Sequence, residues 1–294
     1  MKKILIPAIA MLALTGCQKA EPAKEPAAEG LDTITATIDD QTKAHLEGLK
    51  GYWDANDQIT LSPQSATAAA GAIFTTEAGG ASATFTGTFP ETLTNGKYCA
   101  FYPVSALRTG KWNPGNSSQA SSLNKIAADL PSTQSPSEIT TGVYMDPKTF
   151  WLGGYSTDPT SIKFTPLLSY LKFVVPESTD YKLKKVKIES TVALAGTISV
   201  LCKSVSGVMT WSNETTSSTK STMLQGTEAN SKVLVAGTYY LAFRPVATAS
   251  DVTITFTNTS ENTLYSKKVT SITTKAGTIY DLGTLPTKKE DFPN

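Results

Sequence analysis

Short runs in which apolar and polar residues alternate follow one another along most of the chain. The first runs from Leu31 to Ile38, with Ile34, Ala36 and Ile38 at every second position. A period of two places these three side chains on one face of a β-strand, and we expect that face to be buried. Similar runs recur at intervals of roughly 8–12 residues, with turn-forming residues between them. We expect further strands at 58–62, 68–75, 83–89, 98–103, 162–175, 182–190, 196–201, 233–235, 238–244, 252–257, 264–269 and 278–282.

Two segments lack this alternation. Residues 108–141 are rich in Ser, Asn, Gln and Pro, and they predict a long loop with one short helix near 123–128. Residues 207–226 are rich in Ser and Thr and predict a second loop. Within the strand at 182–190, we expect Val186 and Ile188 to face the core.

A cluster of Ser, Thr, Asp and Pro at 155–160 interrupts the pattern and predicts a domain boundary. The chain from 31 onward is too long for one small β-sandwich, and long Leu-, Glu- and Lys-rich helical stretches are absent. The sequence therefore predicts an all-β protein with two β-sandwich domains in tandem, at 31–158 and 159–294.

The N-terminal segment has the pattern of a bacterial lipoprotein precursor. Two lysines precede the apolar run 4–14, whose last residue begins the sequence Leu-Thr-Gly-Cys that ends at Cys17. This run is too short to cross a bilayer, which takes ~20 apolar residues. We expect 1–16 to be a signal peptide and Cys17 to carry the lipid. Residues 17–30, rich in Ala, Glu, Lys and Pro, predict a flexible tether to the membrane.

The remaining cysteines, Cys99 and Cys202, each lie inside an apolar strand pattern. They could form one disulfide, because exported proteins meet an oxidising compartment. We favour two buried, inert thiols, since a free cysteine often packs as a small hydrophobic residue.

The composition and the motifs favour neither nucleic-acid binding nor catalysis. The formal net charge of +1 gives no basic field. His45 is the only histidine, and no G-x-S-x-G turn is present, so a Ser-His-Asp triad is not expected. Asp54 and Asp57 flank a predicted turn at 52–57, where a capped turn is favoured over a calcium site. We expect no enzyme, no metal and no cofactor.

The order of motifs resembles the fimbrillin family, the lipoprotein precursors of type V pili and related adhesins. Trp53-x-x-x-Asp57-x-Ile59 resembles the family's W-x-x-G-D-x-I motif, with Asn56 at the position of the glycine. Asn also tolerates the left-handed backbone conformation. Five later segments also resemble the family's strand motifs: 85–89, 98–103, 164–173, 237–245 and 275–282. In 164–173, Pro166 takes the place of the usual histidine.

The resemblance implies two transthyretin-like (Greek-key) β-sandwich domains and assembly by strand exchange. In that family a protease removes the first strand after an arginine, and a strand of the next subunit takes its place. Here the removable strand would carry Leu31, Ile34, Ala36 and Ile38. No arginine lies between it and Trp53, so Lys43 and Lys50 are the candidate processing sites.

The sequence therefore predicts a fimbrillin-like outer-membrane lipoprotein whose partners are other pilus subunits and surface ligands. The tail 286–294 is short and charged, which favours an anchor, tip or accessory subunit over a shaft subunit. The alternative is a glycan-binding surface lipoprotein that does not polymerise. In that case Trp112 and Trp211 would stack on sugar rings, although we favour their covering the ends of the cores.

Overall fold

The structure is a computed structural model that describes residues 32–38, 51–63, 72–89, 98–108, 122–158, 160–205, 208–228 and 231–293, without the side chains of 63, 122–125, 202–205 and 208–217. These ranges form strands β1 to β20 and short 3-10 turns, and none of them forms an α-helix. Nothing helical in the described part of the chain has the length and hydropathy to span a membrane. The predicted all-β class is confirmed.

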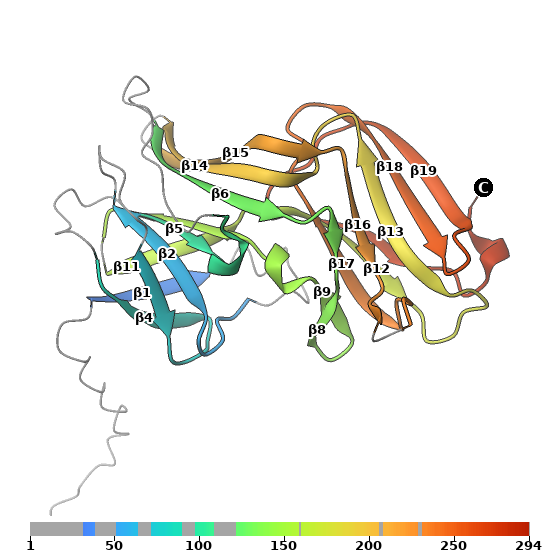
Figure 1. The fold of residues 1–294 in the computed structure, drawn as a ribbon, viewed down its shortest axis with the longest axis horizontal. Helices are drawn as coiled ribbons and strands as arrows, with labels where there is room; N and C mark the ends of the chain where they lie inside the picture. Colours follow the sequence, from blue (N-terminus) through green and yellow to red (C-terminus); the bar gives the residue numbers. More distant parts are fainter. Residues whose placement is uncertain are drawn as a thin grey trace, which may run out of the picture.

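The N-terminal strands close into a barrel, which occupies the left of Figure 1. Around the barrel the order is β1-β11-β10-β5-β2-β3-β4, so β1, the first of the described strands, closes the ring. The strands are β1 (Asp32–Ile38), β2 (Gln58–Pro63), β3 (Ala72–Thr76), β4 (Ser82–Gly87), β5 (Tyr98–Tyr102), β10 (Leu152–Ser156) and β11 (Ser161–Pro166).

Two five-stranded sheets form the other end of the molecule, with orders β20-β12-β17-β9-β8 and β19-β18-β13-β16-β7. The first sheet contains β8 (Ser137–Thr140), β9 (Val143–Met145), β12 (Ser169–Val175), β17 (Gly237–Phe243) and β20 (Ile279–Thr284). The second contains β7 (Thr133–Gln134), β13 (Leu183–Ser190), β16 (Ser221–Gln225), β18 (Ser250–Asn258) and β19 (Thr263–Ile272).

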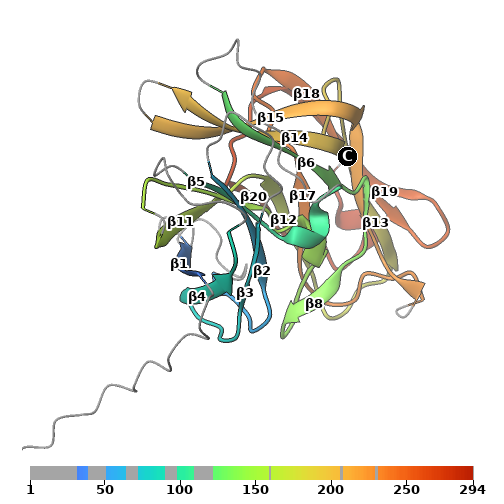
Figure 2. The same cartoon turned by 60° about the vertical axis from the view of Figure 1, so that its left-hand side comes forward.

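A third sheet, of order β15-β14-β6, lies alongside the barrel in both views (Figures 1 and 2). Its strands are β6 (Ser122–Leu130), β14 (Ala195–Val205) and β15 (Val208–Thr219). Ile126 and Leu130 of β6 and Val200 of β14 belong to the same buried cluster as the barrel side chains. This sheet therefore extends the barrel core.

The sheet that contains β12 and β17 contributes to two separate cores. On β12, Tyr170 belongs to the core around the barrel, while Leu171 belongs to the core between the two five-stranded sheets. On β17, Tyr240 faces the first core and Tyr239 the second. Successive side chains of a strand point to opposite faces, so one sheet serves as a wall for both cores.

Hydrogen bonding between strands crosses the expected boundary near 158. Strand β11, which follows the boundary, belongs to the barrel and pairs with β1 and β10. Strands β6, β7 and β9, which precede it, pair with β14, β16 and β17. The division into domains 31–158 and 159–294 stays a prediction.

Gln134, on the short strand β7, connects the two five-stranded sheets. Its side chain is fully buried. Its amide nitrogen donates to the carbonyl of Ala242 (2.6 Å) and to the Thr222 hydroxyl (3.1 Å). Its amide oxygen accepts from the Ala242 N–H (3.0 Å). The side chain thus pairs with the Ala242 backbone as a neighbouring strand would.

Most expected strands are present, and Val186 and Ile188 of β13 are buried as predicted. Leu183 is also buried, because a bulge between Leu183 and Lys185 shifts the alternation. The strand expected at 233–235 is wrong: this segment is irregular, with Leu234 buried.

The two expected loops are wrong where the structure describes them, while residues 109–121 of the first lie outside the described residues. The segment predicted as a short helix, 123–128, lies in β6, which pairs with β14. Most of 207–226 lies in β15 and β16, which pair with β14 and β13. In both places pairing with a partner strand overrides the local sequence preference, and for β6 that partner, β14, lies far along the chain.

Cys99, on β5, is fully buried and disulfide-bonded. The expectation of an inert thiol at this position is therefore wrong. Disulfides persist in the oxidising compartments that exported proteins reach. The Cys202 side chain lies outside those that the structure describes.

Candidate functional site

The candidate site is the position that β1 occupies in the barrel. β1 runs antiparallel to β4, with residues 32–37 opposite 82–87. On its other side it runs parallel to β11, with residues 35–38 opposite 161–164. If β1 left, β4 and β11 would each lose a neighbour and expose unpaired backbone groups.

β1 presents one apolar face to the core. Ile34 and Ala36 have no exposed surface and Ile38 is 1% exposed. The threonines between them face outward, and Thr35 is exposed. The predicted burial of Ile34, Ala36 and Ile38 is confirmed, while Leu31 lies outside the described residues. The role of these residues in strand exchange stays a prediction.

Trp53 lies inside the barrel and forms a hydrogen bond to β1. The residue is 1% exposed, and its indole N–H donates a buried hydrogen bond of 2.9 Å to the carbonyl of Ala36. The ring meets Phe85 of β4 and Phe164 of β11 edge to face, with centroids 5.1 and 5.2 Å away. Trp53 therefore contacts the strands on both sides of β1 and the backbone of β1 itself.

The turn that follows Trp53 is fixed by one carboxylate. Asp57 accepts hydrogen bonds from the Asp54 N–H (2.7 Å) and from the Tyr102 hydroxyl (3.0 Å). Asn56 has a φ of 69°, the left-handed conformation that its position in the motif predicts. Burial, and next the charge of Asp57, raise the pKa of Tyr102 well above its usual value, so the phenol remains a donor. The predicted turn and its capping are confirmed.

Several predicted site residues lie outside the residues or side chains that the structure describes. Cys17, Lys43, Lys50 and Trp112 lie outside the described residues, as does His45. The backbone of Trp211 lies on β15, while its side chain is outside the described side chains. Lipidation, processing and glycan contact at these residues stay predictions. Among the residues that can be placed, no group of three His, Cys, Asp or Glu could hold a metal ion.

The tail packs on the second core, the one between the two five-stranded sheets. Phe292 is buried there, with its ring centroid 5.3 Å from Tyr181 and 6.0 Å from Tyr265. The Tyr181 hydroxyl donates to the Pro286 carbonyl (2.6 Å). The tail also lines a hollow of about 490 Å³ beside β18, β19 and β20. The tail is therefore part of the fold and not a free strand.

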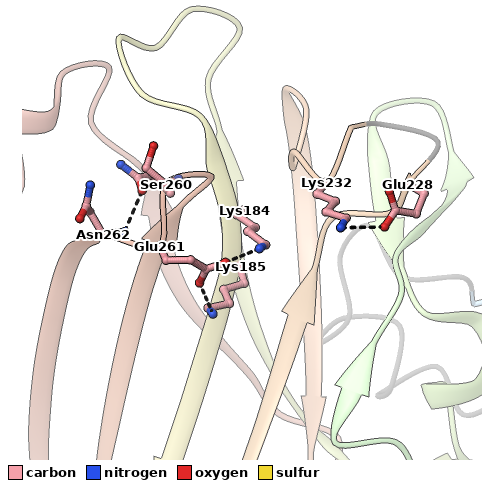
Figure 3. Close-up of polar contacts among 8 residues, drawn as sticks. Lys184, Lys185, Glu228, Lys232, Ser260, Glu261 and Asn262 are labelled. Atoms are coloured by element: carbon pink, nitrogen blue, oxygen red, sulfur yellow. Dashed lines mark hydrogen bonds and ion pairs between the residues drawn. The ribbon is translucent and has the colours of Figure 1, made fainter.

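Glu261 forms a charged cluster at the hairpin between β18 and β19 (Figure 3). Its two carboxylate oxygens pair with Lys184 and, at 2.7 Å, with Lys185. These hydrogen bonds, Lys184 first, lower the pKa of Glu261 from 4.5 to about 2. In the same view, Glu228 pairs with Lys232 at 2.9 Å.

We expect the variant Glu261→Gln to change how stability depends on acid. A depressed carboxyl pKa stabilises the folded state above the unfolded pKa of about 4.5, and this stability is lost as the pH falls toward 2. The wild type should therefore be more stable than the variant above pH 5, with the difference disappearing near pH 2. Urea denaturation between pH 2 and 7 measures this, with Glu228→Gln as the control. A difference that does not change with pH would contradict the prediction.

The N-terminus matches a known sequence model. Residues 1–18 match the model of a prokaryotic membrane lipoprotein lipid attachment site, which ends one residue after Cys17. The match agrees with the predicted signal peptide and with a lipid on Cys17. No curated protein matches the sequence.

Solved structures with a similar fold include adhesion and fimbrial proteins. Two are putative cell adhesion proteins from Bacteroides. The one from Bacteroides uniformis has a TM-score of 0.48, 15% identity and coverage of 88% of this chain and 94% of its own. The one from Bacteroides ovatus has a TM-score of 0.45, 15% identity and coverage of 86% and 91%.

The fimbrial anchor protein Mfa2 from Porphyromonas gingivalis has a TM-score of 0.34 and 10% identity, and covers 81% of this chain and 82% of its own. These proteins are of the class that the sequence motifs resemble.

Proposed function

We propose that this chain is a fimbrial-type adhesion component that can exchange its first strand for a strand of another pilus subunit. In this proposal the protein is anchored to the outer membrane through a lipid on Cys17. The observation that carries the proposal is β1: its apolar face is buried, and it lies between two strands that it alone separates. If β1 left, the apolar side chains that it covers in the barrel, here called the apolar floor, would be exposed between the unpaired edges of β4 and β11. An added strand requires such an apolar surface and such edges.

Within a pilus, we propose an anchor, tip or accessory subunit. A shaft subunit must offer a strand to the next subunit as well as accept one. In the tail of this chain, Phe292 packs against the Tyr181 ring in the second core and the Pro286 carbonyl accepts from the Tyr181 hydroxyl. The tail therefore offers no free strand. No arginine lies between β1 and Trp53, which leaves Lys43 and Lys50 for processing.

Strand exchange can be tested with the full chain after a specific cut. A protease site is inserted between 39 and 50, the chain is cut, and a fluorescent peptide with the sequence of residues 31–38 is added. We expect the peptide to replace β1 and to co-migrate with the protein. A peptide with serine in place of Ile34 and Ile38 is the control, because it cannot fill the apolar floor. If the native peptide is not incorporated even when the cut protein is warmed toward its melting temperature, the proposal is wrong.

We expect Cys17→Ser to release the protein from the membrane fraction. Attachment of the lipid requires the Cys17 thiol, and stable anchoring needs two or more acyl chains on that residue. Fractionation of the cells and labelling with a palmitate probe measure the outcome. A variant that remains membrane-bound and labelled would contradict lipidation at Cys17.

A further inference from the structure

We infer that Trp53 selects which strand can occupy the β1 position. The selected strand has a small residue where Ala36 lies and large apolar residues two positions before and after it. The inference rests on the strand exchange proposed above and names the chemistry of the partner: an extended segment with a large-small-large pattern on one face.

The size requirement follows from what surrounds Ala36. By register, Ile34 lies opposite Phe85 on β4, and Ile38 lies opposite Phe164 on β11. The Trp53 ring contacts both phenylalanines, so it fills the barrel between the two outer positions. Ala36 is fully buried in the same apolar cluster as Trp53, and its main-chain carbonyl accepts the indole N–H at 2.9 Å. A large side chain at this position would have to displace the indole, and such overpacking is destabilising.

The Trp53 indole also selects the register in which a strand pairs at the β1 position. Its N–H donates 2.9 Å to the main-chain carbonyl of Ala36, a group that every residue provides. Successive carbonyls of a strand point in opposite directions. A slip of one residue would turn the carbonyl away from the indole and bring the threonines onto the apolar floor. The buried indole N–H would then lack its acceptor.

The test uses the same cut full-length protein and three peptides of residues 31–38: the native sequence, Ala36→Phe, and Thr35→Phe. Thr35 is exposed, so its substitution is the matched control for the added ring. We expect Thr35→Phe to bind like the native peptide and Ala36→Phe to bind about 10- to 100-fold more weakly. In a Trp53→Leu protein, the penalty for Ala36→Phe should shrink, because the smaller side chain leaves room for the ring.

The outcomes separate this inference from the proposed function. Equal binding of the native and Ala36→Phe peptides to the wild-type protein overturns selection by Trp53 and leaves strand exchange intact. The same penalty with Trp53→Leu as with the wild type also overturns it. If no peptide is incorporated, the native one included, strand exchange itself fails and the inference fails with it. The peptide series on the wild-type protein decides the question even if Trp53→Leu does not fold.

Discussion

Deletion of residues 31–38 is expected to abolish the folded barrel, and a peptide of the same sequence is expected to restore it. The deletion removes the buried side chains of Ile34, Ala36 and Ile38 and the acceptor of the Trp53 indole. Truncating one large buried side chain costs about 2–5 kcal/mol, and a whole domain is stable by only about 5–15 kcal/mol. Near-UV circular dichroism and thermal unfolding of the chain expressed from residue 18 onward measure both effects.

The matched control for this deletion is the removal of residues 18–30. This segment precedes β1 and is predicted to be a tether, so its loss should leave the unfolding temperature unchanged. A protein without 31–38 that unfolds cooperatively near the wild-type temperature, and does not respond to the peptide, would show that β1 is dispensable.

Replacing Gln134 with leucine is expected to destabilise the protein by several kcal/mol. The two side chains are of similar size, so the change removes hydrogen bonds with little change in packing. It leaves the N–H and the carbonyl of Ala242 without their partner in a fully buried position. Each buried polar group left unsatisfied costs about 1–3 kcal/mol. Urea denaturation at neutral pH measures the loss.

Gln225→Leu provides the control, because Gln225 lies on β16, the strand that β7 joins, and is only partly buried. We expect its effect on unfolding free energy to stay within about 0.5 kcal/mol, as for most surface substitutions. Equal stabilities of Gln134→Leu and Gln225→Leu would mean that the bonds to Ala242 contribute nothing.

The features that could be predicted from the sequence are those encoded locally. The alternation of Ile34, Ala36 and Ile38 predicts a strand with a buried face, because the period of two depends only on neighbouring residues. The turn at 52–57 was predictable for the same reason. The helix expected at 123–128 fails because pairing with β14, some seventy residues further along the chain, determines its structure.

The contacts that define the candidate site depend on tertiary structure. Trp53 stands out in the sequence as part of a motif, yet nothing in the motif indicates that its indole binds the backbone of β1. Gln134 lies in a Ser- and Pro-rich stretch without a periodic pattern, and its partner Ala242 is 108 positions away. Such contacts are set by the packing of the sheets, which a single sequence does not reveal.

The place of β1 directly after the tether has a mechanical consequence. With a lipid on Cys17, the covalent path from the membrane to the body of the protein passes through β1. Tension on an attached cell would then load β1 first, and β4 and β11 would share that load along their lengths. A cut between 39 and 50 would leave the lipid on the detached strand. Exchange of that strand would free the body from the membrane, so the uncut chain is the form that can bear tension.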